Sequence, residues 1–217
     1  MGEDYPIGSR RPGTRRTERL QSLSDGVFAF AMTLLVLDLA IPATQQSARH
    51  LLDALLDQWP GYLGYLVSFS TVGAIWLGHN AVTDYLDRAD VTLLRLNLLL
   101  MLFVALLPFP THLLSSYLGI DEAERVAVTA YGITLFVTGA LLLLLWRYAL
   151  HVRLVRPDST DEEVTLLTHR LTPGLAGYAV LIFIGLFFPV VAPFGYLVIA
   201  FFFIIPVPVP WRRRTKP

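Results

Sequence analysis

The sequence predicts an all-α, polytopic membrane protein with six transmembrane helices and both termini in the cytoplasm. Of its 217 residues, 54% are hydrophobic and only 16% are charged, whereas average soluble domains carry about 25% charged residues. Several runs longer than ~20 residues, the length that crosses a bilayer, contain no Asp, Glu, Lys or Arg. The basic residues gather in segments that six crossings place on one side. Together these observations argue against a soluble globular domain.

The first predicted helix covers residues 20–41 and includes two acids, Asp25 and Asp38. Its uncharged core, residues 26–37, follows a basic segment, which is also the pattern of a secretory signal peptide. The two acids and the length of the basic lead argue against cleavage. We therefore expect this segment to stay in the protein as a membrane helix.

The charge-free runs place the other five helices, because a charge at the centre of a bilayer costs roughly 2.5–3.5 kcal/mol. The run 171–211 is too long for one crossing and is interrupted by Pro189, Pro193 and Gly195. Proline ends helices and favours turns, so this run is expected to form a hairpin of two helices. The predicted helices cover residues 59–81, 92–114, 126–148, 172–189 and 194–210.

The distribution of basic residues predicts the orientation. Arginines cluster before residue 20, between residues 147 and 170, and after residue 211. Cytoplasmic segments carry the excess of Lys and Arg, so these three segments are expected in the cytoplasm. Residues 1–17 and 211–217 are predicted basic tails that meet anionic lipid headgroups. Residues 18–210 are predicted to form one six-helix domain.

Composition also excludes several classes of function. The 17 basic and 17 acidic residues balance, so no net positive charge points to nucleic acid. Cysteine is absent, the histidines lack metal-ligand spacing, and no glycine-rich phosphate loop is present. Thr71-Val72-Gly73 matches the start of a potassium-filter sequence, but it lies in mid-helix. We expect no metal site, no cofactor, no nucleic-acid partner and no enzymatic activity.

Six crossings bring three polar stretches to one depth near the cytoplasmic side. An unpaired carboxylate there is costly, so a structural network that links helices 1, 2 and 3 is expected. Its predicted members are Arg19, Ser24, Asp25, Trp76, His79, Asn80, Arg95 and Asn97.

Two other interpretations of these residues remain open. Ser22 and Asp25 fit a capping box that starts helix 1, where an acid also suits the helix dipole. Ser24, His79 and Asp25 could form a hydrolytic triad. No oxyanion loop or nucleophile elbow accompanies them, which argues against the triad.

Helix 1 carries a stripe at helical spacing, formed by Phe30, Thr33, Leu34, Leu37 and Ile41. The stripe is apolar except for Thr33. From the residues alone, packing against lipid or neighbouring helices accounts for it, with Thr33 bonding to a carbonyl of the preceding turn.

Three motifs in the first half of the chain resemble a known family. The segment Arg19-Leu20-Gln21-Ser22-Leu23-Ser24-Asp25-Gly26 resembles the R-x-x-x-F-S-D-G signature that opens helix 1 of the transmembrane protein 175 family. Ile75-Trp76-Leu77-Gly78-His79-Asn80 is similar to its Trp/His ending of helix 2. Asn97-Leu98 and Leu107-Pro108-Phe109-Pro110-Thr111 are similar to its helix 3. Members are potassium-permeable channels of animal lysosomes and of bacteria.

The resemblance implies a homotetramer in the lipid bilayer, with four copies of helix 1 around a pore for potassium and other monovalent cations. By position, Phe30 corresponds to a hydrophobic constriction, and Leu34 and Leu37 also face the pore. Thr33 corresponds to a threonine tied to potassium preference. Leu23 and Phe30 depart from the family pattern, and four Phe30 side chains are expected to close the pore more firmly.

The expected function is a passive, weakly potassium-selective cation channel with a hydrophobic constriction. The alternative is a proton-coupled secondary transporter that uses Asp25 or Asp38, although broken helices and inverted repeats are not evident. All basic residues but Lys216 are arginine, as in GC-rich bacterial genomes. The expected location is therefore a bacterial plasma membrane.

Overall fold

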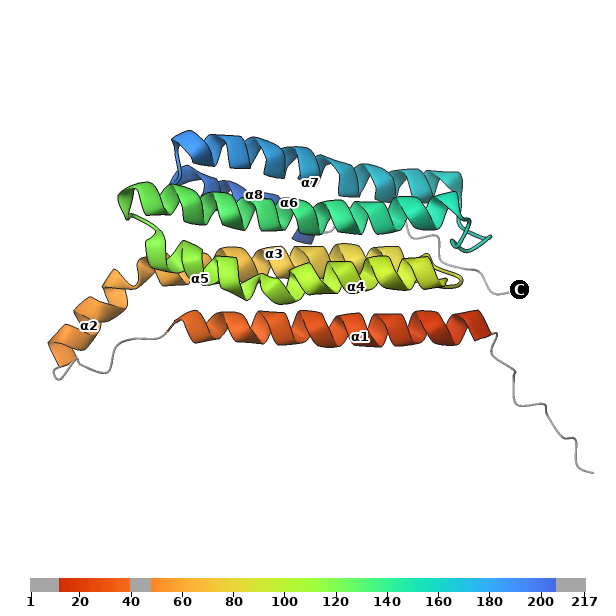
Figure 1. The fold of residues 1–217 in the computed structure, drawn as a ribbon, viewed down its shortest axis with the longest axis horizontal. Helices are drawn as coiled ribbons and strands as arrows, with labels where there is room; N and C mark the ends of the chain where they lie inside the picture. Colours follow the sequence, from red (N-terminus) through yellow and green to blue (C-terminus); the bar gives the residue numbers. More distant parts are fainter. Residues whose placement is uncertain (1–11, 40–47, 206–217) are drawn as a thin grey trace, which may run out of the picture.

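The computed structural model describes residues 12–39 and 48–205, and these residues confirm the all-α prediction. The chain folds into one bundle (Figure 1). Its elements are α1 (Pro12–Leu34), the 3-10 helix η1 (Leu35–Asp38), α2 (Ala48–Asp57), α3 (Trp59–Asp84), α4 (Val91–Leu106), α5 (Pro108–Tyr117), α6 (Asp121–His151), α7 (Asp161–Phe187) and α8 (Val191–Ile204).

The bundle places α1 at one edge, where it packs against α3 and α4. The helix α3 lies in the interior and also contacts α5 and α8. The helix α7 lies at the edge opposite α1, whereas the short helix α2 points away from the bundle (Figure 1). The position of α1 at an edge leaves one of its faces without a partner among residues 12–39 and 48–205.

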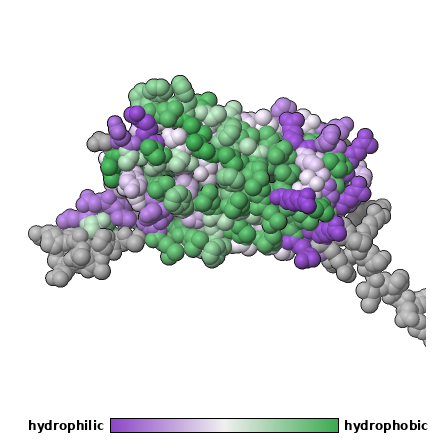
Figure 2. Space-filling view, in the orientation of Figure 1, coloured by the Kyte–Doolittle hydropathy of each residue, from purple (hydrophilic) through white to green (hydrophobic). Residues whose placement is uncertain are grey.

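The surface has the polarity of a membrane protein. Figure 2 shows a broad hydrophobic band across the middle of one face, with hydrophilic residues at both ends. Among the described residues, four helical segments are long and apolar enough to cross a bilayer. These are Arg16–Asp38, Val91–Tyr117, Glu122–His151 and Asp161–Phe187, and the shorter helix Val191–Ile204 is also apolar.

Two helices begin at least eight residues earlier than the charge-free runs indicate. The helix α7 begins at Asp161 rather than at 172, because Thr160 and Glu163 form a capping box at its start. The helix α1 begins at Pro12, so residues 12–17 of the predicted tail are helical. Charged residues end the part of a helix that can lie in a bilayer, but they do not end the helix.

The long α1 corrects the interpretation of Ser22 as an N-cap. Its hydroxyl donates a hydrogen bond to the carbonyl of Glu18, 2.9 Å away, within the helix. Asp25 is likewise in the helix interior, far from the dipole of the first turn.

The segment 92–114, predicted as one helix, consists of α4 and α5, which meet at Leu107. Pro108 lies in the first turn of α5. Proline has no N–H to donate to the preceding turn, which interrupts the helical hydrogen bonds, although Leu107 itself keeps right-handed helical dihedral angles. Residues 1–11, 40–47 and 206–217 lie outside the described residues, and with them lie Ile41, most of both predicted tails and the end of the helix predicted for 194–210.

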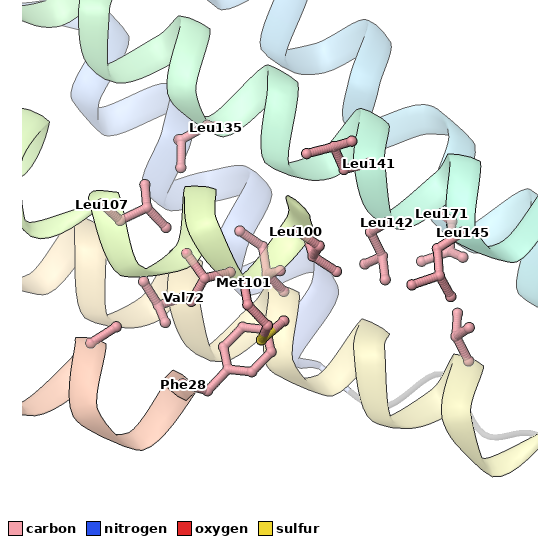
Figure 3. Packing of buried hydrophobic residues seen from close by; sticks show 14 of the residues in the cluster. Phe28, Val72, Leu100, Met101, Leu107, Leu135, Leu141, Leu142, Leu145 and Leu171 are labelled. Atoms are coloured by element: carbon pink, nitrogen blue, oxygen red, sulfur yellow. The ribbon is translucent and has the colours of Figure 1, made fainter. Parts of the chain in front are cut away.

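The interior of the bundle is apolar and closely packed (Figure 3). Phe28 of α1 is fully buried, and Figure 3 shows its ring pointing into the bundle. Its centroid lies 5.6 Å from that of the His79 ring in α3. Helices in a bilayer associate through close packing rather than through removal of apolar surface from water, so the fit of this ring against α3 helps to fix the rotation of α1 about its own axis.

Candidate functional site

The rotation of α1 separates a buried face from an exposed face. The buried residues of α1 follow helical spacing and continue into η1; they are Thr17, Leu20, Ser24, Phe28 and Ala31, followed by Leu35. Phe30 and Leu37 are 64% and 69% exposed. Thr33 is also exposed and Leu34 is half-buried at the border. Phe30, Thr33 and Leu37 of the predicted stripe thus lie on a face that the other described residues leave largely exposed, with Leu34 at its border.

Thr33 is tied to its own helix. Its hydroxyl donates to the carbonyl of Phe30, 2.8 Å away. The proton of the hydroxyl is used in this bond, while the oxygen keeps its capacity to accept or to coordinate. Thr33 therefore offers a fixed oxygen ligand on an otherwise apolar surface.

A buried chain of hydrogen bonds joins α1, α3 and α4. The side-chain oxygen of Asn97 lies 2.8 Å from Nε2 of His79. The amide nitrogen of Asn97 donates to the Ser24 hydroxyl over 3.0 Å, and Ser24 donates to the Leu20 carbonyl over 2.9 Å. Since the Asn97 oxygen can only accept, His79 carries its proton on Nε2.

Asp25 is paired with α3 separately. The indole Nε1–H of Trp76 donates to a carboxylate oxygen of Asp25 over 2.9 Å. A hydrogen bond to a charged group is worth about 1.5–3 kcal/mol. This bond offsets part of the cost of holding a half-buried carboxylate inside a membrane helix.

Three predicted members of the network do not join it. Arg19 and Arg95 are exposed and make no hydrogen bond or ion pair with any residue that the structure describes. Arg95 is two residues from the buried Asn97, and Arg19 is five residues from the buried Ser24. At 3.6 residues per turn, these separations turn each arginine roughly 140–160° away from the buried position. The Asn80 side-chain oxygen is buried, with no partner within the described segments.

The arrangement does not form the alternative hydrolytic triad. The His79 nitrogen that could activate Ser24 is bonded to Asn97 instead. Asp25 is bonded to Trp76 rather than to His79. Within the described segments, no group of three or more His, Cys, Asp or Glu residues is arranged to hold a metal ion.

The structure adds a pair that the sequence reasoning did not connect. Nδ1 of His112 in α5 lies 2.9 Å from a carboxylate oxygen of Asp38, and the two side chains are 61% and 16% exposed. The predicted topology could have found it, because both residues fall near the same end of neighbouring helices. The pair ties the end of the α1–η1 segment to α5.

The structure also contains a chain of hydroxyl groups that the sequence does not predict. The Thr111 hydroxyl lies 2.8 Å from that of Ser68, which lies 3.0 Å from the Tyr131 hydroxyl. It joins α5, α3 and α6 in the bundle interior, so polar side chains there satisfy one another. No spacing rule within one helix reveals a chain that crosses three.

Thr71, Val72 and Gly73 lie inside α3. Thr71 donates to the carbonyl of Val67 over 2.6 Å. Backbone carbonyls inside a helix are already engaged, so this tripeptide does not form a filter.

Comparison with known proteins points to the same family as the sequence motifs, and the matches extend along most of the chain. Residues 19–108 match the family described as endosomal/lysosomal potassium channel TMEM175. A potassium channel of Streptomyces collinus is 35% identical over 205 residues, which cover 92% of this chain and 97% of the relative. The human endosomal/lysosomal proton channel TMEM175 is 32% identical over 142 residues, or 61% of this chain and 28% of the relative.

A solved structure has the same fold. The crystal structure of a lysosomal potassium-selective channel TMEM175 homolog from Chamaesiphon minutus superposes with a TM-score of 0.78 at 31% identity. The match covers 88% of this chain and 97% of that chain. With near-complete coverage of a bacterial relative at 35% identity, this chain belongs to the TMEM175 family.

Proposed function

We propose that this protein is a potassium-permeable, weakly selective cation channel of a bacterial plasma membrane, in which ions pass along the exposed face of α1. The observation that carries the proposal is the pair of faces on α1, one packed into the bundle and one uncovered. Phe30 and Leu37 on the uncovered face are more than half exposed. The bacterial relatives named as potassium channels support the same function.

Six crossings with both termini in the cytoplasm form the proposed membrane topology. The helix α3 has 26 residues, which span about 39 Å at ~1.5 Å per residue. It runs inside the bundle beside segments that are apolar enough to cross. In this proposal α3 and the shorter, apolar α8 supply the remaining two crossings, and the excess of arginine near both ends of the chain supports cytoplasmic termini.

The proposed assembly is a homotetramer. A single α1 at the edge of a bundle cannot enclose a path for ions. Four copies, each turning the same face inward, form a closed ring with cyclic symmetry. Phe28 and the Ser24–Asn97–His79 chain hold this face away from the chain's own bundle.

Phe30, Leu34 and Leu37 form the proposed constriction. A ring of apolar side chains gates by excluding water, and four phenyl groups are large enough to close a narrow pore. The proposed role of Thr33 is selectivity. Its oxygen, fixed by the bond to Phe30, replaces part of the water around an ion.

Ser24, Asp25, Trp76, His79 and Asn97 form the proposed structural polar network that orients α1. Their groups bond to one another and leave no reactive arrangement, so we expect a channel without enzymatic activity. Arg19, Asn80 and Arg95 lie outside this network in the single chain.

The test is ion-selective flux from purified protein in liposomes, with potassium, sodium and proton gradients imposed separately. The proposal predicts passive potassium flux that exceeds sodium flux modestly and does not require a proton gradient. Absence of potassium flux would contradict it. Because animal relatives carry the name proton channel, the proton arm is essential. Uptake that saturates steeply and depends on a proton gradient would instead favour a transporter that uses Asp25 or Asp38.

A further inference from the structure

A partly open cavity of about 220 Å³ lies between α3, α7 and α8, away from the exposed face of α1. Its wall on α3 includes three small residues, Ala74, Gly78 and Ala81, together with Leu77. Leu171 of α7 and Phe203 of α8 form the opposite walls. Apolar cavities of about 150 Å³ hold benzene-sized ligands, so this one has room for part of a hydrocarbon chain.

The cavity continues into the bundle rather than ending at its mouth. A second, smaller space of about 40 Å³ shares Ala74, Gly78, Leu171 and Phe203 with the first. Leu171 is among the core residues labelled in Figure 3. The two spaces lie next to each other along α3, and together we call them the crevice; their arrangement suits a chain better than a compact molecule.

Arg170 is the charged residue in the cavity wall. Its Nη2 donates to the carbonyls of Phe203 and Ile205, 2.9 and 3.4 Å away, at the end of α8. These bonds anchor the half-buried guanidinium at the cavity. Nε and Nη1 have no partner within the described segments, and a guanidinium presents its donors in a planar fork that matches phosphate oxygens.

The depth of Arg170 is that of a lipid headgroup or the start of its acyl chains. Arg170 follows the start of α7, Asp161, by about 14 Å at ~1.5 Å per residue. In the proposed orientation this end of the bundle is cytoplasmic. The cytoplasmic leaflet carries the anionic lipids, and basic pockets between transmembrane helices on this side bind their headgroups.

We propose that this cavity binds an anionic phospholipid, with the phosphate held by Arg170 and part of one acyl chain lying in the crevice of α3. Charge complementarity identifies the occupant. The chain segment that follows α8 is itself basic, with Arg212, Arg213 and Arg214, so its charge does not match that of Arg170. The negative charge of an anionic lipid complements both Arg170 and this basic segment.

The test measures lipid binding to purified full-length protein in detergent by native mass spectrometry and by thermal unfolding. The probes are phosphatidylglycerol, phosphatidylcholine with the same acyl chains, and inorganic phosphate. We expect phosphatidylglycerol to bind and stabilise more strongly than phosphatidylcholine, and phosphate alone to have no effect. Equal effects of the two lipids, or stabilisation by phosphate alone, would overturn the proposal.

Three variants locate the site. Arg170→Gln is expected to weaken phosphatidylglycerol binding roughly tenfold, since a hydrogen bond to a charged group is lost. Ala81→Leu keeps the charge of Arg170 but fills the crevice, and is expected to weaken the binding of both lipids. Arg147→Gln, which removes an exposed arginine of α6, is the control and should bind as the unmodified protein does.

The preference for phosphatidylglycerol is compared within each variant, so a change in overall stability does not obscure it. A preference that survives in Arg170→Gln would place the headgroup contact on other basic residues and refute the site. Unchanged binding in Ala81→Leu would refute the crevice. Ion flux is not the readout, so this test is independent of the channel proposal.

Discussion

Phe28 and Phe30, two residues apart on α1, lie on opposite sides of the helix. Phe28 is fully buried with its ring 5.6 Å from that of His79, whereas Phe30 is 64% exposed. The two phenyl groups are chemically identical, so their different environments follow from the rotation of α1. That rotation, set by Phe28 and the Ser24–Asn97–His79 chain, decides which residues can face a pore.

Phe30→Ala is expected to raise cation leak through liposomes at least severalfold. In the proposed tetramer, removing four phenyl groups widens the ring that excludes water. The matched control is Phe183→Ala on α7, where the phenylalanine is also 64% exposed but far from α1. Flux that is unchanged in Phe30→Ala, or equal in both variants, would contradict the proposed constriction.

Thr33→Ala is expected to lower the ratio of potassium to sodium flux, because the variant lacks the fixed oxygen that we propose replaces hydration water. Thr33→Ser keeps the hydroxyl and should retain most of the ratio. Thr172→Ala is the matched control, since the Thr172 hydroxyl also bonds to a carbonyl of its own helix over 2.8 Å. An identical ratio in Thr33→Ala would remove Thr33 from the selectivity mechanism.

Asn97→Leu is expected to lower the unfolding free energy by about 1–3 kcal/mol. The substitution leaves the Nε2–H of His79 buried without an acceptor, and the penalty for a buried unsatisfied group is of this size. The measurement is thermal or denaturant unfolding in detergent. Leu98→Ala, at an exposed position of the same helix, should change stability less. If Asn97→Leu is as stable as the unmodified protein, the hydrogen-bond chain does not hold α1.

Gly132→Ala and Gly73→Ala are expected to have opposite effects. A Cβ at Gly132 in α6 meets the Tyr196 hydroxyl and lies 2.8 Å from Cγ1 of Ile182. Tyr196 cannot withdraw easily, because it is fully buried and its ring lies 5.6 Å from that of Tyr131. Overpacking of this kind costs about 1–3 kcal/mol.

A Cβ at Gly73 in α3 meets nothing within 4 Å, and alanine favours a helix over glycine by up to ~1 kcal/mol. The two unfolding midpoints in detergent should therefore move in opposite directions. A stabilised Gly132→Ala protein would show that α6 and α8 pack less closely than the structure indicates.

Much of the polar cluster was predictable, because alternating crossings bring the ends of consecutive helices to one depth. Ser24, His79 and Asn97 meet for this reason. Arg19 and Arg95 fall within the same stretches but outside the cluster. The depth of a residue in the membrane is set by its position along the helix. Contact with a neighbouring helix also requires that the side chain lies on the side of the helix that faces this neighbour.

The starts of α1 and α7 and the break at Leu107 show a second limit. Runs without charge locate the apolar part of a helix, but backbone hydrogen bonds continue through Arg15, Arg16 and Glu163. The capping box at Thr160 was visible as a motif, and Pro108 was visible as a helix breaker. Neither can be found by following hydrophobicity alone.

The sequence by itself determined that this is an all-helical membrane protein, and its helix 1 motif determined the family. It also determined the apolar stripe of α1, because helical periodicity is a local property. Only the tertiary structure decided which side of α1 is left uncovered, that Asp38 meets His112, and that Arg170 lies in an apolar cavity. Those relationships depend on the relative rotation of helices far apart in the chain, which packing against their neighbours determines and local periodicity does not.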